Sequence, residues 1–163
     1  NSKFTYFPQT IQDSQQITYN ILQALSNFDF WKISRELTLL GLTDDILWRK
    51  RRWNGSDAYA ESKLHDAMLA FAIARRWRDV RSNSLEPGWV PTKMGGPHAP
   101  DDMDQAHLTQ AWLAASRDSA ADVTGKYFYH MKRMTANTQA HDVVLQERLI
   151  DICTEISGIA LPE

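Results

Sequence analysis

The chain lacks the features that would tie it to a membrane, an oxidising compartment or a strongly charged partner. Its 18 basic and 20 acidic residues give a net charge of −2, so no overall field attracts nucleic acid or a membrane surface. It has neither an apolar run of about 18 residues nor the basic-then-apolar start of a signal peptide. Cys153 is the single cysteine, which excludes an internal disulfide and fits a reducing compartment. We therefore expect a cytoplasmic protein without a membrane or nucleic-acid partner, in which Cys153 packs in the core.

Metal-binding patterns are scarce as well. The five histidines show no His-x-x-x-His spacing. Asp101, Asp102 and Asp104 could together bind a cation, but capping a helix and complementing its dipole explain these carboxylates without one. The sequence therefore predicts no metal site.

What is present is an ordinary globular composition, 43% hydrophobic and 23% charged. Apolar spacing predicts helices and strands in alternation. The helices are expected at 10–28, 57–77, from 101–104 onward and at 141–158, with strands at 28–34, 80–86 and 126–130. Three strand-helix alternations predict an α/β fold, a partial doubly wound (Rossmann-like) parallel sheet with crossover helices.

The helix 57–77 has the clearest signals. Ser56 is expected to be its N-cap, and arginines near its end complement the dipole. Its apolar stripe is Leu64, Met68, Phe71 and Ala72. The inward residues of the final helix are expected to be Leu145, Leu149, Ile152 and Ile156.

Tyr59 and Lys63 lie four positions apart near the start of this helix, so they share one face. An ammonium beside a phenol, whose ordinary pKa is about 10, favours the ionised form. The tyrosine then becomes a usable acid or base near neutral pH. The spacing alone is weak, and an ordinary surface pair is the alternative.

The order of parts strengthens the case: a Tyr-x-x-x-Lys helix, a short strand, then Pro87-Gly88 and Thr92. This order resembles the short-chain dehydrogenase/reductase family, and within it the divergent members related to light-dependent protochlorophyllide reductases and retinol dehydrogenases. The resemblance implies that Tyr59 is the catalytic acid/base and that Lys63 binds the nicotinamide ribose of NAD or NADP. It also implies that the loop carrying Pro87, Gly88 and Thr92 meets the nicotinamide carboxamide. The substrate would be a small molecule with a carbonyl or alcohol group.

The resemblance covers residues 41–163, which we expect to form the C-terminal half of such a domain. Residues 1–40, a helix plus a strand, resemble the family only weakly. Ser34 holds the place of the family's catalytic serine, which would polarise the substrate oxygen. The alternative is that Ser34 caps a helical turn at 35–40.

The family's Thr-Gly-x-x-x-Gly-x-Gly turn, which holds the cofactor pyrophosphate at a helix N-terminus, is absent from this sequence. None of the seven glycines forms it. The chain opens at Asn1 without a Met, and we expect a fragment, a processed product or a chain whose first half was lost. Cofactor binding should then be weak or absent. The alternative function is a catalytically silent remnant acting as an interaction module, with a possible homo-oligomer formed through the Tyr59 helix and the next one.

A basic connector at 44–53 carries Arg49, Lys50, Arg51 and Arg52 between Trp48 and Trp53. Basic residues interleaved with aromatic ones can grip nucleic acid, and an anionic substrate is a second use for them. A solvated face is the plainer interpretation of such a run.

Overall fold

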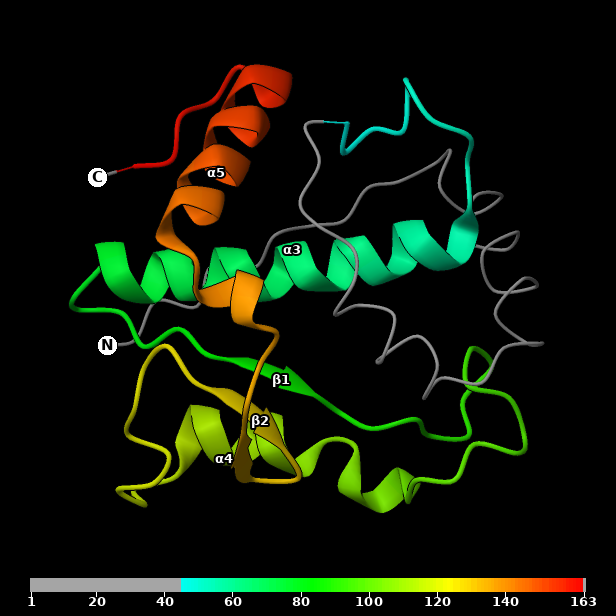
Figure 1. Ribbon diagram of the computed structural model, residues 1–163. Coiled ribbons are helices and arrows are strands. Elements are labelled where there is room, and N and C mark those ends of the chain that lie inside the picture. The colour runs from blue at the N-terminus through cyan, green and yellow to red at the C-terminus, as the bar shows by residue number, and fades with distance from the viewer. Residues whose placement is uncertain (1–44, 163) are drawn as a thin grey trace.

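The computed structural model describes residues 45–162 (Figure 1). The earlier predictions at 10–28 and 28–34, including Ser34, lie outside these residues. The described elements are α3 (Gly55–Arg76), β1 (Ser84–Glu86), the 3-10 helix η1 (Met103–Gln105), α4 (Leu108–Ala115), β2 (Tyr127–Tyr129), β3 (Lys132–Met134), the 3-10 helix η2 (Thr138–His141) and α5 (Val143–Ser157). None of the helices in the described residues is long and apolar enough to cross a membrane.

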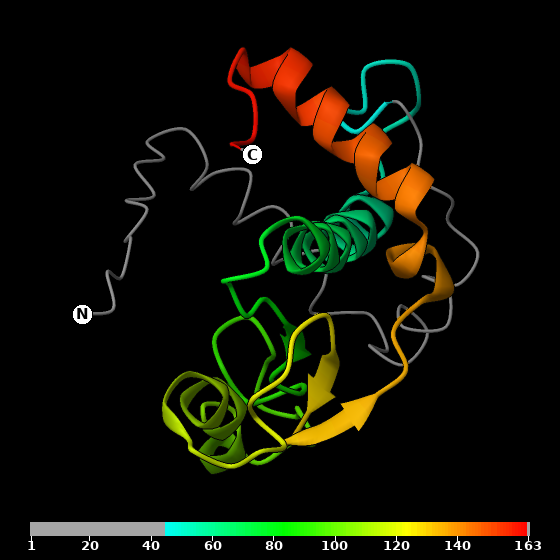
Figure 2. The same cartoon turned by 90° about the vertical axis from the view of Figure 1, so that its left-hand side faces the viewer.

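The elements form layers around a small sheet. Helix α3 covers one face of the sheet and α4 the other, and α5 packs on α3 on the side away from the sheet (Figures 1 and 2). Strand β2 shows why both faces are buried, because successive side chains of a strand point to opposite faces. Tyr127 packs against the α3 core, whereas Phe128, 1% exposed, meets Trp112 of α4 edge to face with ring centroids 5.6 Å apart.

The prediction of a partial Rossmann-like α/β fold is confirmed. Strands β1 and β2 are parallel, with Leu85 opposite Phe128, and the connection between them contains α4. Strand β3 adds to the other side of β2 and runs antiparallel to it, so the described sheet is mixed. The turn between them places His130 and Met131 at φ 47° and 61°, and two left-handed residues form the tight turn that suits a hairpin.

The strand predicted at 80–86 is shorter than expected, starting at Ser84 rather than at position 80. Asn83, the residue just before β1, forms hydrogen bonds with its side chain where a longer strand would use its backbone. The Asn83 side-chain N–H donates to the Val123 carbonyl at 2.8 Å, and its oxygen accepts the Lys126 N–H at 3.0 Å. This amide links the residues just before β1 and β2, and the backbone pairing of the two strands begins one residue later, at Ser84.

The predicted stripe of α3 is confirmed. Leu64, Met68, Phe71 and Ala72 are all at most 5% exposed. The N-cap is Asn54 rather than Ser56. The Asn54 side-chain oxygen accepts the Ser56 N–H at 3.0 Å and the Asp57 N–H at 3.4 Å. Because Asn is at least as good an N-cap as Ser, the helix begins at the earlier of the two cap-type residues.

Helix α5 also matches its predicted span, from its N-cap Asp142 to Gly158, which ends it at φ 70°. Leu149 and Ile152 are buried and Leu145 packs against the core as predicted. Ile156 is 51% exposed instead, because the last turns of α5 rise away from α3 (Figure 1). Cys153 is half-buried and packs against the core, and burial raises the pKa of its thiol.

Candidate active site

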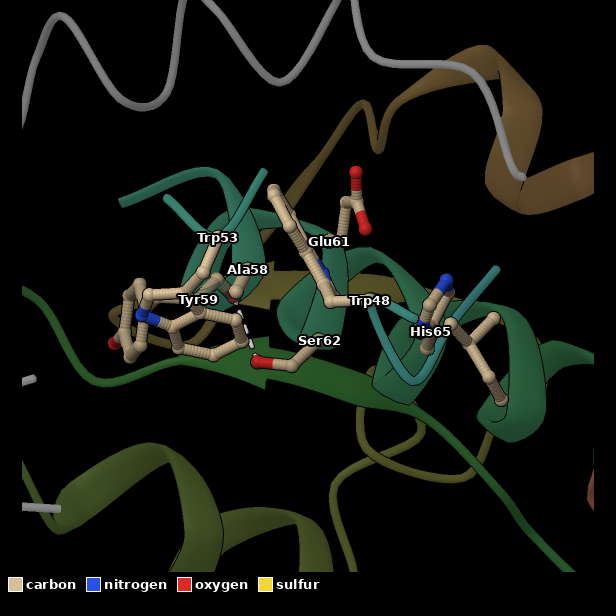
Figure 3. A pocket seen from close by; sticks show the side chains of 8 residues that line it. Trp48, Trp53, Ala58, Tyr59, Glu61, Ser62 and His65 are labelled. Atoms are coloured by element: carbon tan, nitrogen blue, oxygen red, sulfur yellow. Dashed lines mark hydrogen bonds between the residues drawn. The ribbon is translucent and has the colours of Figure 1, made fainter. Parts of the chain in front are cut away.

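Tyr59 lies in the second turn of α3 on the wall of a pocket of about 250 Å³. The pocket is lined by Ile46, Trp48, Trp53, Ala58, Tyr59, Glu61, Ser62 and His65. Figure 3 shows the two tryptophans, both from the segment before α3, lying over the first turns of the helix. Their rings meet edge to face with centroids 5.3 Å apart. The Tyr59 backbone is also held, since its carbonyl accepts the Ser62 hydroxyl at 2.7 Å.

Lys63 lies on the same face of α3 as Tyr59. Its Nζ is 5.7 Å from the centroid of the Tyr59 ring, so the helix brings the predicted pair together. The side chain is 51% exposed and its Nζ pairs with Asp66 Oδ2 at 2.7 Å. Exposed pairs of this kind contribute little free energy, so the ammonium can exchange Asp66 for another partner at small cost.

A partly buried ion pair fixes the connector to the start of α3. Arg51 donates from Nη1 to Glu61 Oε1 at 2.5 Å, and its Nη2 pairs with the other Glu61 oxygen. The Glu61 side chain is 5% exposed. The Arg51 guanidinium also stacks over Trp48, 3.7 Å from the ring centroid. Its hydrogen bond with Glu61 raises the pKa of Arg51.

This pair changes the interpretation of the basic connector. Arg51 is a structural anchor, whereas Arg49, Lys50 and Arg52 are exposed. The sequence did not single out Glu61, which looks like one more acid in a first turn. His65 follows it by four positions and is half-buried, and burial lowers the pKa of its imidazole. The pocket wall beside Tyr59 therefore contains an imidazole that favours the neutral form.

The loop with Pro87, Gly88 and Thr92 leaves β1 at its carboxyl end, and this is the end of the layer where α3 begins (Figure 1). Ligands commonly bind beyond the carboxyl ends of strands in α/β sheets. Gly88 has φ 89°, which suits glycine. The Thr92 hydroxyl is engaged inside the loop, where it accepts the Gly95 N–H at 3.0 Å.

The expectation that Asp101 opens a helix is wrong. The 3-10 helix η1 is capped by Asp102, which accepts the Asp104 N–H at 2.9 Å. Asp101 instead accepts the Trp89 N–H on Oδ2 at 2.5 Å and the Tyr129 hydroxyl on Oδ1 at 3.1 Å. No sequence pattern pointed to this contact, because its partners come from three separate segments.

Three titratable side chains on β1 and β2 have raised pKa values. Burial raises the pKa of Glu86, the last residue of β1, and burial together with Glu86 raises that of Tyr127. Burial and the Asp101 hydrogen bond raise the pKa of Tyr129. These shifts keep both phenols as hydroxyl donors. Across residues 45–162, no three His, Cys, Asp or Glu side chains come together in a way that could hold a metal ion.

Comparison with known proteins finds oxidoreductases. The chain is 40% identical over 109 residues to an uncharacterized oxidoreductase of Emericella nidulans, covering 66% of this chain and 43% of that protein. It is 37% identical over 122 residues to a short-chain dehydrogenase of Gibberella zeae, covering 72% and 47%. It is 28% identical over 138 residues to human retinol dehydrogenase 13, covering 73% and 42%. The chain thus spans less than half the length of these relatives. No family model and no solved structure matches it.

Proposed function

Because the matched part of the chain is a segment of the short-chain dehydrogenase/reductase family, we propose that it serves an NAD(P)-dependent oxidoreductase acting on a carbonyl or alcohol. The observation that carries this proposal is the shared face of Tyr59 and Lys63, with the ammonium 5.7 Å from the phenol ring. The Gly88 turn at the same end of the layer supports it (Figure 1). Both features lie at the end of the layer where α3 begins and β1 ends.

The residues present fit the nicotinamide end of the cofactor. Lys63 offers a half-exposed ammonium for ribose hydroxyls, and the backbone of the loop from Gly88 to Thr92 offers polar groups for the carboxamide. The bound cofactor would supply the hydride. No glycine-rich turn for the pyrophosphate occurs in the sequence, so we expect the 163-residue chain to bind NAD(P)H weakly.

The proton chemistry falls to Tyr59. During reduction its hydroxyl would protonate the carbonyl oxygen, and during oxidation the phenolate would accept the alcohol proton. Lys63 would place its positive charge beside the phenol ring, with Nζ 5.7 Å from the ring centroid. Trp48 and Trp53 would offer apolar surface to the substrate beside Tyr59. Ser34 stays a candidate for polarising the substrate oxygen.

The test is a Tyr59→Phe exchange in a chimera whose nucleotide-binding part comes from a curated relative. Loss of the proton donor should lower kcat by at least about 100-fold, with the Kd for NADPH nearly unchanged. Lys63→Ala should lower kcat and raise the Kd for NADPH. Lys132 is an exposed lysine on β3, and Lys132→Ala should change neither value. Near-normal turnover of Tyr59→Phe would remove Tyr59 from the proposed chemistry.

An interaction module is the second candidate. Within the described residues, β1 forms an edge of the sheet, and such an edge can pair with another chain. Val144 and Ile159 are 76% and 74% exposed. Sedimentation velocity over a hundredfold concentration range tests this: self-association supports the module and a homo-oligomer, and a single monomeric species rejects both.

A further inference from the structure

The segment after the Gly88 turn is a closed loop rather than an open connection. Trp89 and Asp101 lie twelve positions apart, yet two hydrogen bonds join them. The Trp89 N–H donates to Asp101 Oδ2 at 2.5 Å, and the Asp101 N–H donates to the Trp89 carbonyl at 3.0 Å. Loops whose ends meet in this way are compact surface units that often have functional roles.

The interior of this loop is also held together. The Trp89 indole N–H donates to the Gly95 carbonyl at 2.7 Å, and the Gly95 N–H donates to the Thr92 hydroxyl at 3.0 Å. The Gly96 N–H reaches the Thr92 carbonyl at 2.9 Å. The loop therefore keeps its own shape, and its placement on the sheet depends on its closing residues.

Asp101 connects the closed loop to the sheet. Its Oδ1 accepts the hydroxyl of Tyr129 at 3.1 Å, and Tyr129 pairs in the sheet register with Glu86, the residue just before Pro87. One carboxylate thus binds the loop with one oxygen and β2 with the other. Hydrogen bonds to a charged acceptor are stronger than those between neutral groups.

The same carboxylate explains the glycine at position 88. A Cβ on Gly88 would lie 2.7 Å from Asp101 Oδ2, at a backbone φ of +89°. The space that a side chain would take is filled by the carboxylate. The position of the Asp101 carboxylate therefore requires a glycine at position 88.

We propose that Asp101 is a positioning residue that fixes the orientation of the Gly88 turn, and that the Tyr129 hydroxyl holds Asp101 in place. The consequence for the cofactor rests on the proposed function, in which the backbone from Gly88 to Thr92 meets the nicotinamide carboxamide. Asp102 offers a matched control, because it is an adjacent aspartate whose side chain only caps η1.

Tryptic cleavage after Lys93, an exposed lysine inside the loop, reads out this placement without any ligand. Cleavage after Arg148, which lies within α5, reports general unfolding in the same digest of the full chain. Asp101→Ala and Tyr129→Phe should speed cleavage after Lys93 about tenfold, since a lost hydrogen bond to a charged group raises the open population by about that factor. Cleavage after Arg148 should stay constant. Asp102→Ala should leave both rates unchanged, and Asp101→Asn, which keeps one acceptor oxygen, should show a smaller rise.

NADPH titration by fluorescence separates the two proposals. In the full chain, Asp101→Ala should raise the Kd for NADPH about tenfold and Asp102→Ala should not change it. A parent chain that shows no NADPH binding would agree with the missing pyrophosphate turn and would leave the proposed function to the Tyr59→Phe chimera, while the Lys93 cleavage rates would still decide the role of Asp101. Equal cleavage after Lys93 in the parent and in both Asp101 variants would overturn the assignment.

Discussion

Replacing Arg51 by Ala should destabilise the protein far more than replacing the neighbouring Arg52. Arg51 forms a two-point ion pair with Glu61 and stacks on Trp48, whereas Arg52 is exposed. The variant Arg51→Ala leaves the Glu61 carboxylate, which is 5% exposed, without its cationic partner. An uncompensated buried charge is the costly outcome of breaking such a pair.

The magnitude follows from the burial of the two partners. Removing one member of a fully buried pair costs about 3–5 kcal/mol. The Arg51 side chain is 27% exposed, so water replaces part of what the carboxylate loses, and we expect about 2 kcal/mol. For a chain of this size that corresponds to a Tm lower by about 4–8 °C.

Urea unfolding followed by tryptophan fluorescence measures this difference, with the free energy of unfolding taken from the midpoint and slope. Arg52→Ala is the matched control and should change the free energy by less than about 0.5 kcal/mol. Adding Glu61→Gln to Arg51→Ala removes the unpaired charge and should recover part of the loss. Equal midpoints for Arg51→Ala and Arg52→Ala would refute a structural role for the pair.

Three further predictions concern Lys63, the cofactor and Glu147. Asp66→Ala should keep or strengthen NADPH binding, measured by fluorescence titration, because it frees the Lys63 ammonium from a 2.7 Å contact; weaker binding would contradict the ribose role. The parent 163-residue chain should have a Kd for NAD(P)H well above micromolar by calorimetry, since the pyrophosphate turn is absent from its sequence. Arg76 and Arg75 lower the pKa of Glu147 below its ordinary 4.5, so their pairing stabilises the fold above about pH 4.5 and is lost as the pH falls through the lower folded-state value. Glu147→Gln should therefore flatten the loss of stability between about pH 5 and pH 3 in acid titrations followed by circular dichroism, and an unchanged slope would argue against the pairing.

Most of the successful predictions came from the helical spacing of apolar residues. The stripe Leu64, Met68, Phe71 and Ala72 was readable because burial repeats every three or four residues in a helix, and the Tyr59–Lys63 contact follows from the same geometry. The carboxyl-end position of Gly88 followed from a strand and a turn that are adjacent in the sequence. In each case the deciding interactions are local.

The missed features depend on contacts between distant segments or on unusual backbone. The hairpin at His130 and Met131 has two left-handed residues without the Gly or Asn that normally signals such a turn. The burial of Glu61 depends on Arg51, ten positions earlier. Asp101 carries cap-like chemistry by its sequence, and only the fold brings Tyr129 to its second oxygen.

The two ends of α3 are held by interactions of different strength. At the Tyr59 end, a nearly buried Glu61 binds Arg51, and Asp101 ties the neighbouring loop to the sheet. At the far end, the pairs of Arg75 and Arg76 with Glu147 are 29–39% exposed, and exposed pairs contribute little. The more buried of these ion pairs is therefore at the end of α3 where Tyr59 and Lys63 lie. Preorganised supporting contacts are what a reactive constellation needs to hold its geometry, whereas a surface used only for association has no such requirement at this end.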